Sequence, residues 1–380
     1  MDSTVKNLLT LIKCALTDSV GILTDDIKWD ELYALASSHR ITTLVYYGIK
    51  ACKVLPPDSV LAKFEKSIYK STMLSATNDY EISRVIKAFE ENGIYHAPLK
   101  GLVVRDFYPR PEMRFVADAD MIIDEAQIDK ISEILKELGF KSDHESSHEY
   151  VWTKGVGVNI ELHKHFLGKR YRKYYDYYEN NRRELLKPCA ISGLYEMSID
   201  DLFVFLIVHI AKHYRSGGIG LRHFIDIYVI LNSSIALNEE YVKCELEKLG
   251  LDRFYANIRK MLSAWFYDGD YDDATRLMTA RIFASGVFGK KKNRAIAVSA
   301  DFSSSKKLFR SRFPDYISMK QKYPILVKIP ILLPIFWFVR IFDIIFLERG
   351  RIDAYMKRKK LINRENVSAH KTELEIVGIE

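Results

Sequence analysis

Apolar and polar residues follow the period of an α-helix in the N-terminal part of the chain. Apolar side chains recur three or four positions apart in residues 5–12 and again in residues 29–36, which places them on one face of a helix. Residues 56–59 (Pro-Pro-Asp-Ser) indicate a turn before a further helix, and Asn92-Gly93 is a typical helix end. The pattern predicts an N-terminal helical region at residues 1–92.

After residue 92 the pattern changes to short strands separated by turns. Residues 94–99 form a short apolar run that predicts a strand, and Lys100-Gly101 then turns the chain into a brief helix. Residues 125–138 carry an apolar stripe and predict a longer helix. This mixture predicts a compact core at residues 93–168.

Two more strands are predicted near the end of that core. Residues 148–153 and 156–163 are joined by a Lys-Gly turn, and the second segment alternates strictly between apolar and polar positions. Val156, Val158, Ile160 and Leu162 form the apolar face. Glu161 lies on the polar face, where its carboxylate is available for chemistry.

Helical spacing returns in the C-terminal part of the chain. Segments such as 199–214 and 221–231 predict helices within a C-terminal helical domain at residues 169–300. An apolar helical segment is predicted at residues 301–350. The final residues, 351–380, are mostly polar, and we expect them to be poorly ordered.

The pair Asp118 and Asp120 is the most informative feature of the sequence. It enters an apolar run, and side chains two positions apart on a strand point to the same face, so the two carboxylates lie together while Ala119 and Met121 face the other way. Like charges beside a buried run are costly unless a positive group lies between them. A hard divalent cation with oxygen ligands fits that position, so the pair predicts metal-assisted phosphate chemistry.

The composition is that of a globular protein, with 48% hydrophobic and 28% charged residues among 380, a length that favours two or three domains. The net charge of +7 suits a phosphate-bearing partner without singling out nucleic acid.

The N-terminal residues lack the layout of a signal peptide. The cysteines are widely spaced, which is typical of reduced thiols in a cytoplasmic protein: Cys14, Cys52, Cys189 and Cys244.

Residues 324–347 are strongly apolar, although a spanning helix needs roughly 20 consecutive apolar residues. Two interpretations remain open: a helix packed on the body of the protein, or a helix lying on the inner face of a membrane as a peripheral contact. A span through the bilayer is disfavoured because charged residues and prolines interrupt the run: Lys328, Arg340, Asp343, Pro330 and Pro334.

Four short motifs occur in a fixed order. They are residues 97–101 (Ala-Pro-Leu-Lys-Gly), 108–109 (Tyr-Pro), 114–120 (Arg-Phe-Val-Ala-Asp-Ala-Asp) and 160–163 (Ile-Glu-Leu-His). Together with weaker matches at residues 29–39 and 209–226, this set resembles a bacterial family of uncharacterised nucleotidyltransferases, within the DNA-polymerase-β-type nucleotidyltransferase superfamily. The resemblance implies an α+β fold, in which a small mixed-sheet core is flanked by helical N- and C-terminal regions.

The resemblance also implies a reaction. Asp118, Asp120 and Glu161 would hold two Mg²⁺ ions, or Mn²⁺ in their place, and act as the catalytic residues. A hydroxyl-bearing acceptor would attack the α-phosphate of a nucleoside triphosphate such as ATP, and pyrophosphate would leave. The acceptor would be a small molecule, or a protein, peptide or tRNA end.

Phosphate contacts are implied for Lys100, Gly101 and Arg114. This chain has Gly101-Leu102 where many members of the superfamily have Gly-Ser, so the hydroxyl of that serine is missing at the phosphate turn. An alternative for Arg114 is a salt bridge with the aspartates when no ligand is bound, which does not exclude a catalytic role.

Further residues are weaker candidates for the pocket. His163 follows Glu161 on the same face. His209 and His213 have the i, i+4 spacing of a zinc pair but lack the glutamate of H-E-x-x-H. Arg222 and Asp226 are expected to pair with each other across one helical turn, or alternatively to line the pocket with His209.

Two alternatives concern the partner and the activity. Residues 169–175 (Lys-Arg-Tyr-Arg-Lys-Tyr-Tyr) interleave bases and aromatics as RNA-binding segments do, although nearby acids favour a half-exposed helix. The alternative to an enzyme is a catalytically idle nucleotide-binding or scaffold module, docked to a membrane-associated assembly through residues 324–347.

Overall fold

The computed structural model describes residues 1–267, 269–286, 296, 313–314, 316–346 and 364–379. Its N-terminal part is helical, as predicted from the apolar spacing. Leu8 and Ile12 are fully buried because α1 and α3 pack against each other along the apolar stripe of α1. The helices of this part are α1 (Ser3–Thr17), α2 (Trp29–Ser38), α3 (Thr42–Ala51) and α4 (Asp58–Glu91).

Five strands form a mixed sheet in the order β1-β2-β5-β4-β3, in which only β2 and β5 are parallel. This confirms the expected α+β architecture. One face of the sheet is apolar, and its buried side chains, including Met121 and Ile160, pack with side chains of α4 and α6. The strands are β1 (His96–Pro98), β2 (Asp118–Ile123), β3 (Lys141–Glu145), β4 (Glu149–Lys154) and β5 (Val158–His163).

Short helices connect the strands on the way round the sheet. β1 leads through the Lys100-Gly101 turn into the first of them, and Asp124 caps the turn that opens α6 by accepting from the Ala126 N–H. They are α5 (Gly101–Val104), η1 (Arg105–Phe107), η2 (Pro111–Met113), η3 (Glu125–Gln127) and α6 (Ile128–Glu137).

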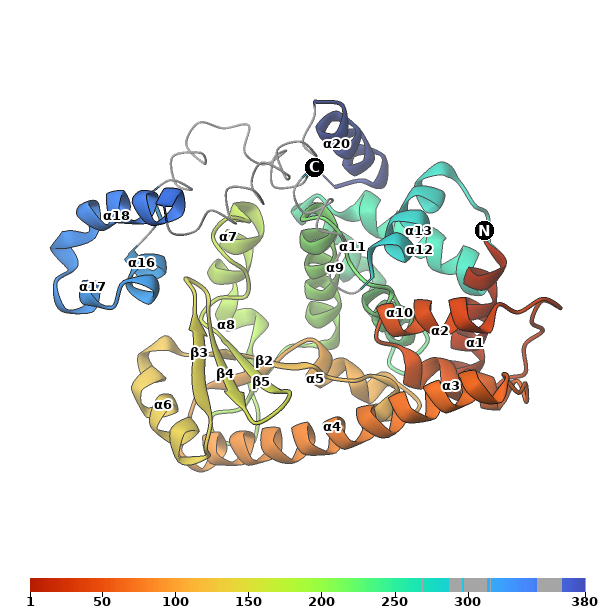
Figure 1. Cartoon of the computed structure of the whole chain (residues 1–380), viewed down its shortest axis with the longest axis horizontal. Helices are drawn as coiled ribbons and strands as arrows, with labels where there is room; N and C mark the ends of the chain where they lie inside the picture. The colour runs from red at the N-terminus through yellow and green to blue at the C-terminus, as the bar shows by residue number, and fades with distance from the viewer. Residues whose placement is uncertain (268, 287–295, 297–312, 315, 347–363, 380) are drawn as a thin grey trace.

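The C-terminal helices cover the side of the molecule opposite α4 (Figure 1). Ser198 caps α9, as its Oγ accepts from the Asp201 N–H, and α9 and α10 lie side by side in the core. The elements are α7 (Arg172–Asn180), α8 (Arg182–Leu185), β6 (Lys187–Pro188), β7 (Tyr195–Glu196), α9 (Ile199–Arg215), α10 (Leu221–Leu231), α11 (Glu239–Leu249), α12 (Asp252–Phe266) and α13 (Asp273–Ser285).

The 34-residue helix α4 connects two hydrophobic cores. Near its start, Val60 and Phe64 belong to the core that includes the N-terminal helices. Near its end, Ile82, Val85 and Phe89 belong to the core under the sheet. Figure 1 shows α4 running along one side of the molecule from the N-terminal helices to the sheet.

One expectation about local structure was wrong, and one strand was missed. Val156 was expected to belong to the apolar face of a strand, but β5 begins at Val158 and Val156 is exposed in a turn. Gly155 and Gly157 both have positive φ, a conformation that bends the chain there. The edge strand β3 was not predicted, because its residues are almost all exposed and polar.

The C-terminal tail also differs from its expectation. Residues 364–379, expected to be poorly ordered, include α20 (Arg364–Val377), whose Leu374 and Val377 are buried in the core. Glu373 accepts hydrogen bonds from Tyr214 and Arg281, and the Asn257 amide donates to the Val377 carbonyl at 3.1 Å. The other residues of the predicted polar tail, 351–363 and 380, lie outside the described residues.

Part of the apolar segment forms a small helical unit of its own, α16 (Tyr316–Lys322), α17 (Ile325–Lys328), η4 (Pro330–Leu332) and α18 (Leu333–Phe346). Lys320 of α16 reaches Glu145 of β3 at 3.0 Å, which ties the unit to the edge of the sheet. Among the described helices, none combines the length and apolar character needed to cross a membrane.

Candidate active site

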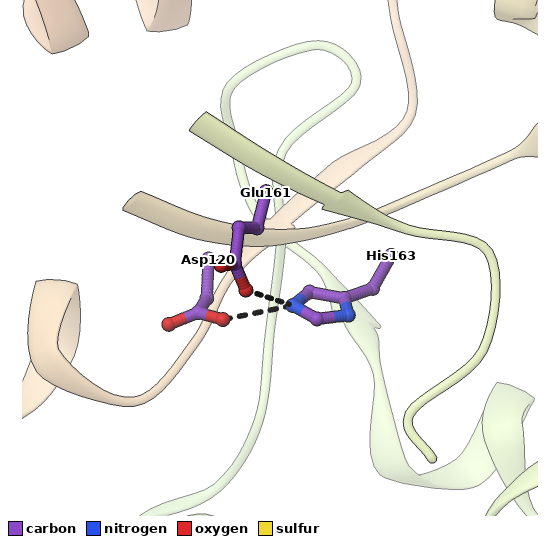
Figure 2. Close-up of side chains that lie close together, drawn as sticks. All are labelled: Asp120, Glu161 and His163. Atoms are coloured by element: carbon purple, nitrogen blue, oxygen red, sulfur yellow. Dashed lines mark hydrogen bonds and ion pairs between the residues drawn. The ribbon is translucent and has the colours of Figure 1, made fainter. Parts of the chain in front are cut away.

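The parallel pairing of β2 and β5 brings the predicted acids together. Asp120 lies directly opposite Glu161 in the register, and Asp118 lies opposite Asn159. Since Ala119 and Leu162 are buried on the apolar face, the acids project from the other face of the sheet. Figure 2 shows Asp120, Glu161 and His163 converging from the two strands.

Asp120, Glu161 and His163 form a compact group. One ligand atom from each lies within 4.8 Å of the others. His163 Nε2 is 2.8 Å from Asp120 Oδ1 and 3.7 Å from Glu161 Oε2. Lys100 also donates from Nζ to Asp120 Oδ1 at 2.5 Å. Two carboxylates and an imidazole at this spacing are a ligand set that suits a divalent cation.

Asp118 takes a different position from Asp120. Its carboxylate is exposed and accepts a hydrogen bond from Asn159 Nδ2 at 3.2 Å. It lines one cavity together with Asp120, Glu161 and His163. It does not belong to the compact group formed by the other two acids with His163. Asp120 is the buried member of the pair and Asp118 the solvent-facing one.

The electrostatics of the group favour an added positive charge. Burial raises the pKa of Glu161 to about 8, with further contributions from the neighbouring Asp120 and Asp118 carboxylates. Burial alone would also raise the pKa of Asp120, but Lys100 and His163 outweigh burial and hold it well below its usual range. One cation and one imidazole thus stabilise one carboxylate and leave Glu161 under-neutralised, so the residues present fit a divalent metal ion.

Glu149 and His148, on or next to β4, are site residues that the sequence analysis missed. Glu149 lies opposite His163 in the sheet register, with its Oε2 3.6 Å from His163 Nδ1 and 3.0 Å from His148 Nε2. Both line the cavity. The signal was the position of Glu149 on the strand predicted beside Glu161.

The alternative pairing of Arg114 with the strand aspartates was wrong. Its guanidinium makes a bidentate, buried ion pair with Asp226, with Nε at 2.7 Å and Nη2 at 2.8 Å, and not with the strand aspartates. Tyr108 also donates to Asp226 at 2.8 Å. Because Arg114 occupies the Asp226 carboxylate, the expected Arg222–Asp226 pair does not form among the described residues. Arg222 instead donates to the Phe115 carbonyl at 3.3 Å.

The turn at Lys100-Gly101 is tight. Lys100 has a φ of 51°, a left-handed conformation that is strained for a lysine. A Cβ at Gly101 would lie 3.4 Å from Arg114 Nη2, so the turn passes within van der Waals contact of the guanidinium. Lys100, Gly101 and Arg114 all line the same cavity.

A second wall of this cavity comes from α9 and α10. The cavity, of about 340 Å³, lies between the acids and a group of basic and imidazole side chains. Burial lowers the pKa of Lys212 to about 8 and that of Arg222 to about 10, and neighbouring cations add to both shifts. Burial also holds the pKa of His209 and His223 well below the usual histidine range. The side chains of this wall are His209, Lys212, His213, Arg222 and His223.

Two cations of this helical wall have no acid partner at ion-pair distance within the described part of the chain. The Lys212 side chain lines the cavity and forms neither a hydrogen bond nor an ion pair there, and the Nε of Arg222 is buried without a hydrogen-bond partner. A buried donor such as Arg222 Nε is costly unless a ligand satisfies it. Lys212 was missed in the sequence, although it lies three residues after His209 on the same helix.

Comparison with known proteins gives a family. A family model described as "Uncharacterised nucleotidyltransferase" matches residues 25–267. The solved structures include a similar one, the solution structure of the antibiotic-resistance factor ANT(2'')-Ia, at 12% identity and a TM-score of 0.35, covering 49% of this chain and 96% of that one. No curated protein matches.

Proposed function

This chain belongs to the family of uncharacterised nucleotidyltransferases, and we propose that it transfers a nucleoside monophosphate from a Mg²⁺-bound triphosphate to a hydroxyl-bearing acceptor. The observation that carries the proposal is the compact group of Asp120, Glu161 and His163, which faces a wall of cations across one cavity. Acids that hold metal ions and cations that hold phosphates are the two parts that such a transfer requires.

The metal ions would be held by Asp118, Asp120 and Glu161. When bound, Mg²⁺ would stabilise the negative charge on the α-phosphate during the transfer. His163 donates from Nε2 to Asp120 Oδ1 in the tautomer that this contact favours, which orients the carboxylate. Lys100 donates to the same oxygen and stabilises its negative charge.

The reaction balances without any further reactant. The acceptor oxygen forms a bond to the α-phosphorus, the bond from that phosphorus to the bridging oxygen of the β-phosphate breaks, and pyrophosphate leaves. We assign the proton of the acceptor hydroxyl to Glu161, which borders the cavity. The leaving phosphates would contact the Lys100-Gly101 turn, and Lys212 and Arg222 would hold the triphosphate from the helical side.

The test is release of pyrophosphate and labelling of an acceptor in a metabolite extract, with Mg²⁺ and each labelled triphosphate. Asp118→Ala and Asp120→Ala should abolish the activity, and Asp129→Ala, on the exposed face of α6, should leave it unchanged. Equal activity in all four proteins would contradict the proposal.

The alternative of an idle module makes a different prediction about metal. An intact acid group binds Mn²⁺, which electron paramagnetic resonance detects directly without substrate. Binding that is strong in the wild type and lost in Asp120→Ala supports the enzyme, whereas no Mn²⁺ binding together with no activity supports the idle module.

RNA is the second candidate acceptor, and one observation favours it. The basic, Tyr-rich segment lines a second cavity of about 310 Å³, and Lys212 borders both this cavity and the one at the acids. A phosphate backbone held there would lie next to the reaction site. Salt-sensitive binding of single-stranded RNA, lost on neutralising Lys169, Arg170 and Arg172, would support it.

We propose that the protein works in the cytoplasm, at the inner face of the membrane. The four cysteines are free thiols in the structure, which suits a reducing compartment.

A further inference from the structure

The helical unit formed by α16, α17, η4 and α18 has an unusual surface. Along η4 and α18, four exposed side chains are apolar and follow one another at spacings of four, three and four residues, which places them on one face of a helix. The row consists of Ile331, Ile335, Phe338 and Phe342, which are 84%, 58%, 68% and 58% exposed. We call it the apolar row.

Two polar groups of α18 are bonded within the unit. The Trp337 indole N–H donates to the Pro314 carbonyl at 2.9 Å, and Asp343 accepts from the Tyr323 hydroxyl at 2.5 Å. Lys322 lies 3.5 Å from the same carboxylate. A helix on a water-exposed surface normally turns its polar side outward. Here that arrangement is reversed, so the unit is built for surroundings less polar than water.

The apolar surface extends beyond the row. Ile325, Val327 and Ile329, which precede it in the chain, are 46%, 62% and 45% exposed, and the exposed Lys328 lies among them. Contiguous apolar surface on a protein marks an interaction site. A lysine among apolar side chains reaches with its ammonium group toward a charged surface while its stem stays in apolar contact.

Charge complementarity identifies the partner. Residues 287–312 contain eight lysines and arginines and one aspartate, and residues 349–360 contain six and one. Since the whole chain carries only +7, the remainder is net acidic, and the positive charge is concentrated in the sequence on both sides of the helical unit. Apolar insertion together with basic flanks is the combination that binds anionic phospholipid surfaces.

We propose that the apolar row docks onto a bilayer containing anionic lipids, with α18 lying along the surface. This rests on the exposed side chains and the charge distribution, and not on the proposed catalytic function. The ion pair between Lys320 and Glu145 links the unit to β3, and the neighbouring strand β4 carries Glu149 of the cavity. Docking would therefore bring the cavity near the membrane surface.

The experiment is flotation of the full chain with vesicles of phosphatidylcholine alone and of phosphatidylcholine with phosphatidylglycerol. We expect binding to the anionic vesicles, weakened by added salt. Phe338→Glu should lower the partition coefficient about tenfold, because it removes an inserting ring and adds a negative charge. Leu55→Glu is the matched control, since Leu55 is equally apolar and highly exposed but lies far from the unit in sequence; it should bind like the wild type.

Three results would overturn the proposal. The wild type does not float with anionic vesicles, Phe338→Glu floats as well as the wild type, or Leu55→Glu loses as much binding as Phe338→Glu. Light scattering after size exclusion tests the competing occupant: a wild-type dimer that Phe338→Glu converts to monomer, without lipid binding, would make the row a contact between two copies. Circular dichroism and the catalytic rate without lipid verify that Phe338→Glu is folded, since Phe338 lies outside the cavity.

Discussion

The two walls of the cavity differ in how their charges are satisfied. We call the wall formed by β2 and β5 the sheet wall. There the Asp120 carboxylate is hydrogen-bonded to both Lys100 and His163. On the helical wall, Lys212 and Arg222 have no acid at ion-pair distance within the described chain, and burial lowers the pKa of each. The sheet wall is thus organised around carboxylates that need a cation, and the helical wall around cations that need an anion. A metal-bound triphosphate supplies both.

The largest effect should come from breaking the sheet wall. Asp120→Asn keeps the size of the side chain but removes the charge shared by Lys100 and His163, and we expect kcat to fall about 10³-fold, which corresponds to about 4 kcal/mol. Pyrophosphate release measures it, with Asp129→Asn as the control. A loss of less than tenfold would mean that Asp120 is not at the reaction centre.

The buried ion pair of Arg114 and Asp226 links the segment before β2 to α10. Breaking this pair should lower the stability of the fold. Asp226→Asn leaves a buried guanidinium without its charge partner, so we expect the free energy of unfolding to fall by about 3 kcal/mol. Urea denaturation measures it. Asp176→Asn removes the exposed pair with Arg172 and should cost less than about 0.5 kcal/mol; equal losses in the two variants would contradict the assignment.

The helical wall is positioned by His39, whose Nδ1 accepts from the Leu221 N–H at the start of α10. Burial lowers the pKa of His39 to about 4, against about 6.5 in an unfolded chain. Between these values the unfolded chain binds the extra proton, so stability falls as the pH falls. We expect about 2 kcal/mol of stability to be lost from this site between pH 7 and pH 5.

His39→Asn should remove this contribution, because asparagine can accept the same hydrogen bond without titrating. Denaturation of wild type and variant across this pH range tests it, and the difference between the two profiles isolates His39 from the other buried histidines. Parallel profiles would show that His39 does not titrate in this way.

The smallest effect is expected on triphosphate affinity, when a cation of the helical wall is neutralised. Lys212→Gln removes one unpaired cation from the helical wall and should raise the Kd of a non-hydrolysable triphosphate about tenfold, or about 1.4 kcal/mol. Fluorescence titration measures it, with Lys243→Gln on the exposed side of α11 as the control. An unchanged Kd would leave Lys212 to bind the acceptor, which steady-state KM for that acceptor would then reveal.

Sequence reasoning predicted the sheet wall better than the helical wall, and the reason is physical. The strands β2 and β5 were predicted because their alternation is local and one face is buried, which fixed the faces of Asp118, Asp120 and Glu161. The ion pair of Asp226 was missed because Arg114 is 112 residues away. The i, i+4 rule favoured Arg222, but it describes exposed helix surfaces, and α10 is mostly buried.

β3 and α20 were both missed because most of their residues are polar. β3 was missed because an edge strand facing water needs no apolar alternation. The tail was expected to be poorly ordered because it is polar overall, yet α20 needs only a few apolar contacts, such as Leu374 and Val377, to pack on the core. Average composition of a segment does not reveal such contacts.

The long helix α4 restricts how the gene can change. Each residue of an α-helix advances the side chains by about 100°, so one codon inserted between Phe64 and Ile82 would turn one set of core side chains away from its partners while the other stayed in place. Insertions of seven residues, about two turns, would keep both faces aligned while moving the two cores apart by about 10 Å. Natural length variation in the family should therefore spare this stretch and accumulate in the loops.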